Sequence, residues 1–314
     1  MVAAVAELTP VGRFAPTPSG RMHLGNVFSA LLAWLSVRSR GGEMVLRMED
    51  LDTERTSAEF AETLRRDLAW LELDYDRETP AQSTRKEAYD RAFSRLEELG
   101  LVYPCYCTRS RLHSVDAPHL SDGTYVYPGT CRSLTEAERA AFSRPPAWRV
   151  MVDSREWVVP DRVQGEYRCV LSRDCGDMVI RRADGVYVYQ LAVTVDDGEA
   201  GVTEVVRGMD LLSSAPRQMY LQELLGLPHP EYAHVPLLLA SDGRRLSKRD
   251  RDLDLGELRS RMTPRQLTGW LAHAAGLIDR AEAVSPRELA QEFSWDKIHG
   301  DRILVDPRTL PQNG

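Results

Sequence analysis

Short apolar segments alternate with longer amphipathic segments over the first part of the chain. Residues 11–15 predict a strand. After a turn at 16–20, apolar residues recur with the i, i+3, i+4, i+7 spacing of a helix that ends at 41–42. Residues 43–48 and 57–73 repeat this order of strand and helix. The alternation predicts an α/β protein in which crossover helices connect the strands of a parallel sheet.

The middle of the chain interrupts this alternation, which then resumes before a helical tail. Residues 105–131 form a loop-rich insertion with Pro, Gly, Ser and Asp, and several short strands are expected between 148 and 195. The remaining expected elements are strands at 203–207 and 233–239 and helices at 213–225, 267–277 and 286–293.

Composition and charge narrow the class of protein. The 314 residues are 43% hydrophobic and 28% charged, and no apolar run approaches the roughly 18 residues of a membrane span. The N-terminus lacks the basic residues of a signal peptide, so we expect a globular protein without a membrane partner. The formal charge of -7 does not indicate a nucleic-acid binder. RNA binding needs only a local basic surface, however. Candidates, which could equally form a solvated charged face, are Arg244, Arg245, Lys248, Arg249, Arg251, Arg259, Arg261 and Arg265.

The five cysteines are few and unevenly placed, which indicates a reducing cytoplasm and a local metal site rather than a set of disulfides. Cys105 and Cys107 form a C-x-C pair, and Cys131 follows after a loop. Three thiolates suit a tetrahedral ion, above all zinc, which requires a fourth ligand. Ligand chemistry alone favours His113 or His119 for that position.

Two motifs could together form an ATP site. In residues 18–26 a glycine turn leads into a helix, whose first N–H groups attract phosphate, and His23 adds a further donor. Residues 244–249 form a basic segment in which Lys248 could neutralise charge on departing pyrophosphate. Each motif alone would suit an ordinary surface turn or loop, but the two in this order are specific.

These motifs resemble the signatures of the class I glutamyl-tRNA synthetases. Residues 13–20 with His23-Leu24-Gly25-Asn26 are similar to the opening and the HIGH motif of that family, and 245–249 are similar to its KMSKS motif. Asn26 stands where HIGH ends in histidine. Further similar blocks, which extend the resemblance over roughly residues 11 to 255, are 189–192, 195–197, 202–212 and 215–218.

The resemblance implies that glutamate attacks ATP with its own α-carboxylate, with Mg²⁺ on the phosphates and glutamyl-adenylate as the product. It implies catalytic roles for His23 and Lys248. Arg13 and Arg207 would hold carboxylates, Glu49 the ammonium group, and Tyr189 would donate a hydrogen bond. The complete glutamate set is Arg13, Ala15, Thr17, Glu49, Tyr189 and Arg207. The ATP set is Pro16, Ser19, Gly20, His23, Gly25, Asn26, Arg245, Leu246, Ser247 and Lys248.

The residues themselves leave alternatives to two of these roles. Glu49 begins an acidic run that could be a solvated helix start, and Arg207 could pair with Asp210.

The cysteine spacing resembles a short branch of this family, the glutamyl-queuosine tRNA(Asp) synthetases, in which C-x-C is followed by Tyr-x-x-x-Cys. Tyr127 and Cys131 match that spacing. The resemblance therefore implies Tyr127 as the fourth ligand of one structural zinc ion, beside Cys105, Cys107 and Cys131. Cys169 and Cys175 lie outside this cluster, and we expect them to be structural.

The resemblance also implies a Rossmann-like catalytic domain with a zinc-binding insertion, a small helical C-terminal tail and no anticodon-binding domain. The expected segments are 1–100 for the first half of the catalytic domain, 101–195 for the insertion and connective region, 196–255 for the second half with its KMSKS-like loop, and 256–314 for a tail that contacts an RNA stem.

The expected function is transfer of glutamate to queuosine in the anticodon stem-loop of tRNA(Asp), with ATP and L-glutamate as substrates, by a cytoplasmic monomer. Two alternatives remain at this stage. One is a truncated synthetase that charges a tRNA 3′ end. The other is a regulator that binds tRNA without catalysis.

Overall fold

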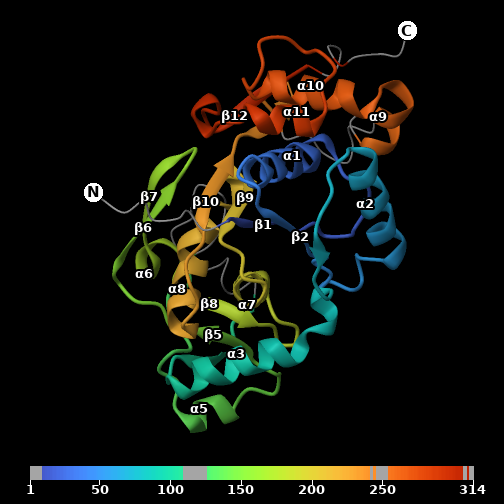
Figure 1. Cartoon of the computed structure of the whole chain (residues 1–314). Coiled ribbons are helices and arrows are strands. Elements are labelled where there is room, and N and C mark those ends of the chain that lie inside the picture. The colour runs from blue at the N-terminus through green and yellow to red at the C-terminus, as the bar shows by residue number, and fades with distance from the viewer. Residues whose placement is uncertain (1–8, 109–125, 241–242, 245–253, 307–309, 311–314) are drawn as a thin grey trace.

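A seven-stranded sheet runs through the centre of the molecule (Figure 1) in the order β3-β2-β1-β9-β10-β6-β7. The computed structural model describes residues 9–108, 126–240, 243–244, 254–306 and 310. All neighbouring strands of this sheet are parallel except β6 and β7, which form an antiparallel hairpin. The strands are β1 (Val11–Phe14), β2 (Glu43–Leu46), β3 (Arg77–Glu78), β6 (Glu156–Asp161), β7 (Gly165–Val170), β9 (Glu204–Gly208) and β10 (Glu231–Val235).

The order of the first five strands is that of a Rossmann-like sheet. From β1 the chain proceeds outward through β2 to β3 and later returns to the other side of β1 with β9 and β10. In such a sheet, ligands bind outside the carboxyl ends of the strands at the point where the direction of winding reverses. Here that point lies between β1 and β9.

Helices connect these strands, as the sequence predicts. α1 follows β1 and α2 follows β2, while α7 and α8 lead into β9 and β10. Ser57 caps α2 by accepting a hydrogen bond from the Phe60 N–H, which satisfies one of the free donors of the first turn. The principal helices of the catalytic sheet are α1 (Leu24–Arg38), α2 (Ala58–Trp70), α3 (Lys86–Glu98), α7 (Tyr189–Glu199) and α8 (Ala215–Leu225), with the 3-10 turns η1 (Gln82–Thr84) and η2 (Met209–Ser214).

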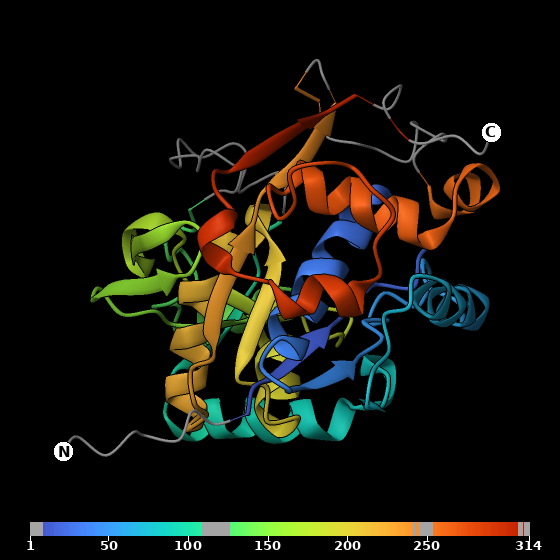
Figure 2. The same ribbon diagram turned by 45° about the horizontal axis from the view of Figure 1, so that its top comes forward.

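Helix α1 is enclosed between the sheet and the C-terminal tail (Figure 2). Eleven of its fifteen residues are buried, which is typical of a helix that packs on both faces. Leu258, Leu271 and Leu289 of the tail belong to the same hydrophobic core. The tail consists of α9 (Leu255–Arg261), α10 (Pro264–Ala274), α11 (Pro286–Gln291), η4 (Trp295–Lys297) and β12 (Arg302–Val305).

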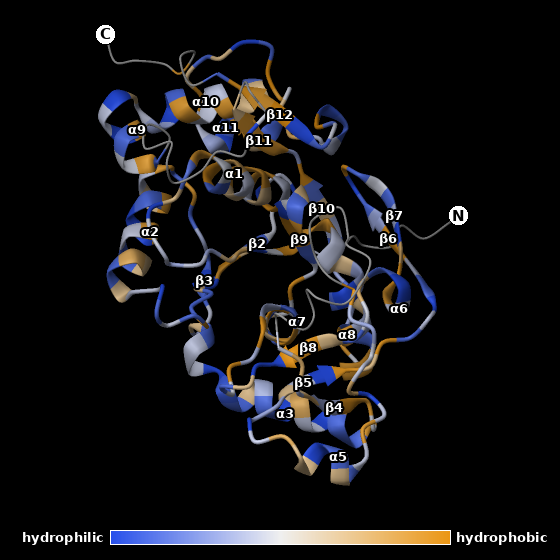
Figure 3. Ribbon diagram, turned by 180° about the vertical axis from the view of Figure 1, so that it is seen from behind, coloured by the Kyte–Doolittle hydropathy of each residue, from blue (hydrophilic) through white to orange (hydrophobic). Residues whose placement is uncertain are grey.

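A second hydrophobic core lies on the other side of the molecule, around α3, α7 and α8. Figure 3 shows α3 with both hydrophilic and hydrophobic residues, as expected of a helix with one buried face. Near it lies a small antiparallel sheet in the order β4-β5-β8. Its strands and the short helices of this region are β4 (Val102–Cys105), β5 (Ala147–Val150), β8 (Met178–Arg181), α5 (Glu136–Ala140) and α6 (Leu171–Asp174).

The strand predicted at 233–239 is wrong as a single element. It is divided at Pro236 into β10, which belongs to the central sheet, and β11 (Leu237–Ala240), which pairs only with β12 among the described strands. Proline has no N–H to donate to a neighbouring strand, so the ladder ends there. The tail is also not wholly helical, because β12 pairs with β11 in parallel.

Candidate active site

A cavity of about 540 Å³ opens at the carboxyl ends of β1 and β9, the position expected for a ligand in this type of sheet. The structure places around it every predicted glutamate or ATP residue that it describes. These are Arg13, Ala15, Pro16, Thr17, Ser19, Gly20, His23, Gly25, Asn26, Glu49, Tyr189 and Arg207. The other predicted residues, Arg245, Leu246, Ser247 and Lys248, lie outside the described residues. The strand β11, which precedes them in sequence, contributes Leu237, Leu238 and Leu239 to the wall.

The first turn of α1 faces this cavity. His23 is the N-cap residue, and its Nδ1 accepts a hydrogen bond from the Asn26 N–H at 3.4 Å. In return the Asn26 side chain accepts from the His23 N–H at 3.3 Å. Because Nδ1 acts as an acceptor, the ring proton of neutral His23 resides on Nε2. Gly25 lies under this ring, since a Cβ there would come within 3.1 Å of Cε1. Asn26 thus has a capping role that the comparison with HIGH could not reveal.

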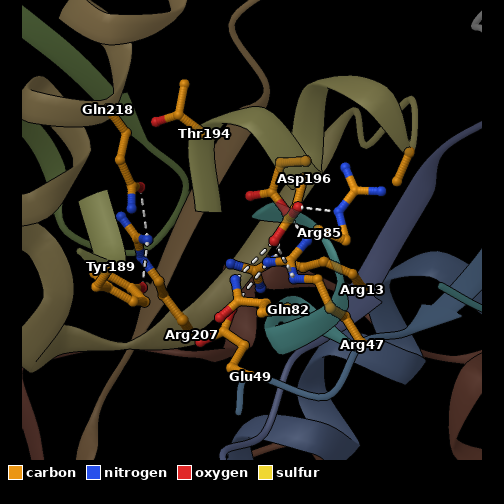
Figure 4. Close-up of polar contacts among 12 residues, drawn as sticks. Arg13, Arg47, Glu49, Gln82, Arg85, Tyr189, Thr194, Asp196, Arg207 and Gln218 are labelled. Carbon is orange, nitrogen blue, oxygen red and sulfur yellow. Dashed lines mark hydrogen bonds and ion pairs between the residues drawn. The ribbon is translucent and has the colours of Figure 1, made fainter. Parts of the chain in front are cut away.

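Arg207 extends from β9 and contacts three neighbours, of which Figure 4 shows Gln218 and Tyr189. Its Nη1 donates to Gln218 Oε1 at 2.8 Å and to Tyr189 Oη at 3.4 Å. Its Nε lies 3.0 Å from His234 Nε2. Its Nη2 is buried and has no hydrogen-bond partner among the described residues. The guanidinium group therefore keeps one donor nitrogen for a ligand.

His234 connects Arg207 to a buried carboxylate. Its Nδ1 lies 2.6 Å from Asp161 Oδ2, and both side chains are fully buried. Burial lowers the pKa of His234 to about 4, with Arg207 acting in the same direction and Asp161 opposing both. Burial acts to raise the pKa of Asp161, but hydrogen bonding and attraction to His234 outweigh it and lower that pKa.

Arg13 and Glu49 meet in a second group of buried charges, centred on Arg47, which is 0% exposed. Arg47 donates to Asp197 Oδ1 at 2.5 Å and to Glu49 Oε1 at 3.0 Å. Arg13 donates to the Val206 carbonyl at 3.0 Å and lies 3.6 Å from Asp197 Oδ1. The alternative that Glu49 begins a solvated helix is wrong, because Glu49 lines the cavity and lies outside any helix.

The ionisation of these carboxyl groups follows from their partners. Burial acts to raise the pKa of Asp197, but Arg47 and Arg13 outweigh it and hold that pKa below its usual range. Burial raises the pKa of Glu49, although Arg47 opposes this change. Burial also lowers the pKa of Arg13, against the attraction of Asp197. Arg13 and Glu49, which line the cavity, therefore have pKa values that depend on their buried neighbours Arg47 and Asp197.

The neighbouring Asp196 links this group to the segment after β3. It accepts hydrogen bonds from Gln82 at 2.7 Å, from Arg85 at 2.6 Å and from the Tyr89 hydroxyl at 3.0 Å. Figure 4 shows Gln82, Arg85 and Asp196 converging from separate elements. Helix α7, which carries Tyr189 into the cavity, is thereby fixed to η1 and α3.

Sequence reasoning assigned no role to the residues that support the cavity from behind. A signal was present, because ionisable residues stand inside otherwise apolar runs: Arg47 between Leu46 and Met48, and His234 between Ala233 and Val235. Such residues are rarely buried unless they are paired. The full set that was missed is Arg47, Gln82, Arg85, Asp161, Asp196, Asp197, Gln218 and His234.

The three cysteines of the predicted metal site also lie together. Their sulfur atoms are all within 4.8 Å of one another, so this cluster could hold a metal ion. Cys107 Sγ is 3.6 Å from Cys131 Sγ. The Tyr127 hydroxyl lies 3.5 Å from Cys105 Sγ and 3.9 Å from Cys107 Sγ. His113 and His119, the alternative fourth ligands, lie outside the described residues.

Gly176 and Arg149 both pack against Tyr127 in this cluster. Gly176 has a φ of +67°, and a Cβ there would lie 2.2 Å from the Tyr127 carbonyl oxygen, so only glycine permits this approach. Arg149 lies over the Tyr127 ring at 3.6 Å, and its Nε donates to Cys105 Sγ at 3.2 Å. Burial acts to raise the pKa of Cys105, but Arg149 and Tyr127 outweigh it and lower that pKa. Burial raises the pKa of Cys107 to about 11.

Two arginines of the late basic group are paired with acidic residues near α2. Arg259 Nη1 lies 2.9 Å from Asp67 Oδ1, and Arg265 Nε lies 3.1 Å from Glu72 Oε1. These contacts attach the tail to α2.

Among the helices that the structure describes, none is long and apolar enough to cross a membrane.

Comparison with known proteins agrees with this architecture. Residues 11–296 match the family model described as tRNA synthetases class I (E and Q), catalytic domain. A glutamate tRNA ligase from Elizabethkingia meningosepticum, solved in complex with its amino acid, superposes with a TM-score of 0.79 at 28% identity, covering 94% of this chain and 67% of that one. The glutamate-tRNA synthetase of Elizabethkingia anophelis gives a TM-score of 0.80 at 28% identity, with 95% and 68% covered.

Curated relatives of nearly the same length are more similar in sequence. The glutamyl-Q tRNA(Asp) synthetase of Symbiobacterium thermophilum is 44% identical, with 95% of this chain and 97% of the relative covered. That of Nocardia farcinica is also 44% identical, with 96% and 94% covered. The chain therefore belongs to the class I tRNA synthetases of the E and Q group and, within that group, to the glutamyl-Q tRNA(Asp) synthetase family.

Proposed function

We propose that the cavity binds L-glutamate and ATP and forms glutamyl-adenylate. In this reaction an α-carboxylate oxygen of glutamate bonds to the α-phosphorus of ATP, and the bond to pyrophosphate breaks. The observation that carries the proposal is that twelve residues, predicted from the segment 13–26 and from the distant positions Glu49, Tyr189 and Arg207, surround one cavity. Such a reaction needs positioned reactants and neutralised charge rather than a protein nucleophile.

Glutamate carries two carboxylates and one ammonium group, and the cavity offers partners for all three. Arg207 keeps Nη2 for a carboxylate, and Tyr189 adds a hydroxyl beside it. Arg13 supplies the second cation, while Glu49 is the carboxylate available for the ammonium group. Arginine suits these positions because its planar group binds a carboxylate with two donors and stays charged when buried.

ATP would bind across the first turn of α1. The free N–H groups and positive dipole end of this 15-residue helix attract phosphate, and His23 adds its Nε2 proton. Arg245, Leu246, Ser247 and Lys248 would also contact ATP, with Lys248 offsetting charge on the phosphates. Mg²⁺ bound to the phosphates would offset their charge.

The acceptor in our proposal is queuosine in the anticodon stem-loop of tRNA(Asp). A hydroxyl of its cyclopentenediol ring attacks the carbonyl carbon of glutamyl-adenylate, loses its proton and displaces AMP. The shared name of the curated relatives supports this acceptor. The base would have to leave its stack to reach the cavity, as bases in single-stranded loops can.

The cysteine cluster fits one structural zinc ion held by Cys105, Cys107, Cys131 and Tyr127. Tetrahedral bonds of about 2.3 Å to sulfur and 2.0 Å to oxygen separate two sulfurs by about 3.8 Å, and a sulfur from the oxygen by about 3.5 Å. The distances of 3.6 Å between Cys107 and Cys131 and of 3.5 Å between Cys105 and Tyr127 agree with this geometry. The ion would stabilise the fold of this region.

The decisive experiment is transfer of labelled glutamate to tRNA isolated from cells with and without queuosine. We expect label only on the queuosine-containing tRNA. The label should survive removal of the terminal adenosine and be abolished by periodate treatment of the queuosine diol before the reaction.

Each rival predicts a different result. Label on both tRNA preparations, lost with the terminal adenosine, would show charging of a 3′ end and refute the queuosine acceptor. Absence of glutamate-dependent exchange between ATP and pyrophosphate would refute glutamate activation itself and favour a regulator that only binds tRNA.

A further inference from the structure

Two buried residues behind the cavity, His234 and beyond it Asp161, lie on the Nε side of Arg207, whereas Tyr189 and Gln218 contact its Nη1. His234 and Asp161 do not line the cavity, so neither can touch a substrate there. His234 nevertheless lies 3.0 Å from Arg207 Nε, and Asp161 lies 2.6 Å from the other ring nitrogen of His234. The three groups form a continuous chain from β6 through β10 to β9.

The direction of the hydrogen bonds in this chain is fixed by chemistry. A guanidinium group has only donors, so Arg207 Nε requires an acceptor, and His234 Nε2 can accept only without a proton. The single ring proton then sits on Nδ1, where Asp161 accepts it. The opposite tautomer would direct two N–H groups at each other across 3.0 Å.

Asp161 cannot rotate freely to accept a different arrangement. Its Oδ1 accepts backbone N–H groups from Val163 at 3.0 Å and Gln164 at 2.9 Å, while the His234 N–H lies 3.1 Å from both Oδ1 and Oδ2. Its Oδ2 is thereby held against His234 Nδ1. The carboxylate thus stands in a fixed orientation set by the turn that follows β6.

The sheet itself places His234 beside Arg207. The two residues are direct partners in the parallel pairing of β9 and β10, so their side chains emerge on the same face. The ring of His234 stacks on Tyr232 with centroids 5.9 Å apart, and Arg207 lies 5.6 Å above that same Tyr232 ring. Backbone register and ring stacking therefore both restrict the His234 ring.

We propose that Asp161 and His234 are positioning residues for substrate binding. Asp161 selects the His234 tautomer in which Nε2 is unprotonated. This nitrogen accepts from Arg207 Nε and orients Arg207 so that Nη2 faces the substrate carboxylate. This inference rests on the proposed binding of glutamate in the cavity. The affinity for glutamate then depends on which ring nitrogen of His234 carries the proton, although His234 itself does not touch the ligand.

The sharpest test is Asp161→Asn, which changes one oxygen to an amide nitrogen. The Val163 and Gln164 N–H groups, which bond Oδ1 alone, keep the amide oxygen at that position, so the new NH₂ group faces His234 Nδ1. That nitrogen must then accept, and the ring proton moves to Nε2, against Arg207. In exchange between ATP and pyrophosphate, we expect KM for glutamate to rise about tenfold or more, with KM for ATP unchanged.

Two substitutions of His234 separate positioning from packing. His234→Gln carries a carbonyl oxygen to the place of Nε2 and can still accept from Arg207. His234→Asn reaches only the place of Nδ1 and leaves Arg207 without an acceptor. We expect KM for glutamate to rise strongly in His234→Asn and much less in His234→Gln, whereas a purely structural role would lower the free energy of unfolding in His234→Asn and leave KM for glutamate unchanged in both. The matched control is His229→Asn, which makes the same substitution at a histidine that does not contact Arg207 or Asp161.

Direct observation of the tautomer keeps the test independent of activity. In ¹⁵N-histidine-labelled protein, NMR should find the His234 proton on Nδ1 in the unmodified chain and on Nε2 in Asp161→Asn. A proton on Nε2 in the unmodified chain would overturn the inference, as would an unchanged KM for glutamate in Asp161→Asn. If the unmodified protein shows no glutamate-dependent exchange, the proposed function fails and the NMR result alone decides the tautomer.

Discussion

The cavity and the cysteine cluster are both polar sites, but they differ in what balances their charges. At the cavity, Arg47 is fully buried against Glu49, Asp196 and Asp197, so the protein supplies both signs of charge. At the cluster, three thiols and a phenol converge, with the cation Arg149 in direct contact with Cys105. Thiols become good metal ligands only as thiolates, whose charge one arginine cannot balance.

The hydrophobic cores around the two sites also differ in size. The cavity rests on the central sheet and on a hydrophobic core shared with α1 and the tail. The cluster belongs to a small core whose buried members are Tyr103, Cys105, Tyr127 and Cys131. The described part of this core has four buried residues and four partly buried ones, far fewer than the core that includes α1. One site is therefore balanced by the protein's own charges, whereas the other gathers thiols that could hold a metal ion.

Metal removal should separate the two regions most strongly. Zinc binding contributes on the order of 10 kcal/mol in small zinc-dependent folds, so a chelator should release the cluster while the central sheet stays folded. Cys105, Cys107 and Cys131 should then react with a thiol reagent. Cys169 and Cys175, which are buried outside the cluster, should stay protected and serve as the internal control.

Two outcomes would break the comparison. Reaction of all five thiols at once would mean that the sheet depends on the metal as well. Continued protection of the first three at full chelation would mean that the protein alone holds the cluster.

Removal of the central cation of the other site should have the next largest effect. Arg47→Met leaves Glu49, Asp196 and Asp197 near one another without that cation. Breaking a buried ion pair in this way typically costs about 3–5 kcal/mol, which urea unfolding would measure as a lower free energy of unfolding.

The control is Arg65→Met, the same substitution at a pair with Glu78 in which Arg65 is 34% exposed. Solvent screening should limit its cost to about 1 kcal/mol or less. Equal losses in the two variants would contradict the view that the cavity is held by its buried charges.

Acid should weaken the region around the cavity by a smaller amount. The folded-state pKa of His234 is about 4, below the usual 6.5, because burial and Arg207 disfavour its charged form. The unfolded chain therefore takes up this proton first, and stability falls between about pH 6.5 and pH 4, by up to about 3 kcal/mol. Asp161 acts in the same direction at lower pH. Its pKa is lower in the folded protein, so the stability that it contributes is lost as the pH falls below its unfolded pKa.

Urea unfolding at pH 7 and pH 5 would measure this loss. His234→Gln lacks the titrating ring, so the unmodified chain should lose more stability than this variant over the same interval. Any metal release at pH 5 affects both proteins and cancels in the difference. An equal loss in both would show that His234 is not the group responsible.

The sequence predicted local elements and ligand-facing residues better than it predicted long-range support. Apolar spacing was sufficient for β1 and α1, and the resemblance to the synthetase motifs assigned His23 and Arg207 to one site, whose cavity both residues line. Neither type of pattern specifies which strands pair across the chain. The role of His234 follows from its register with Arg207 on a neighbouring strand, and the strand β12 follows from pairing with β11, a segment many residues earlier.

Pro236 illustrates the same limit. An apolar run continues on both sides of it, so periodicity alone predicts one strand. The missing N–H divides the run and directs its second half to the tail. A proline inside a predicted parallel strand was the available signal for this division.

The enclosure of α1 has a consequence for how the protein is made. This helix leaves the ribosome early, yet Leu271, Leu289 and Val305, which belong to its core, are among the last described residues to be translated. Its outward apolar face must therefore stay exposed until the tail has also been translated, and such surfaces attract chaperones or other nascent chains. The part of the cavity wall built on α1 cannot reach its final packing before then.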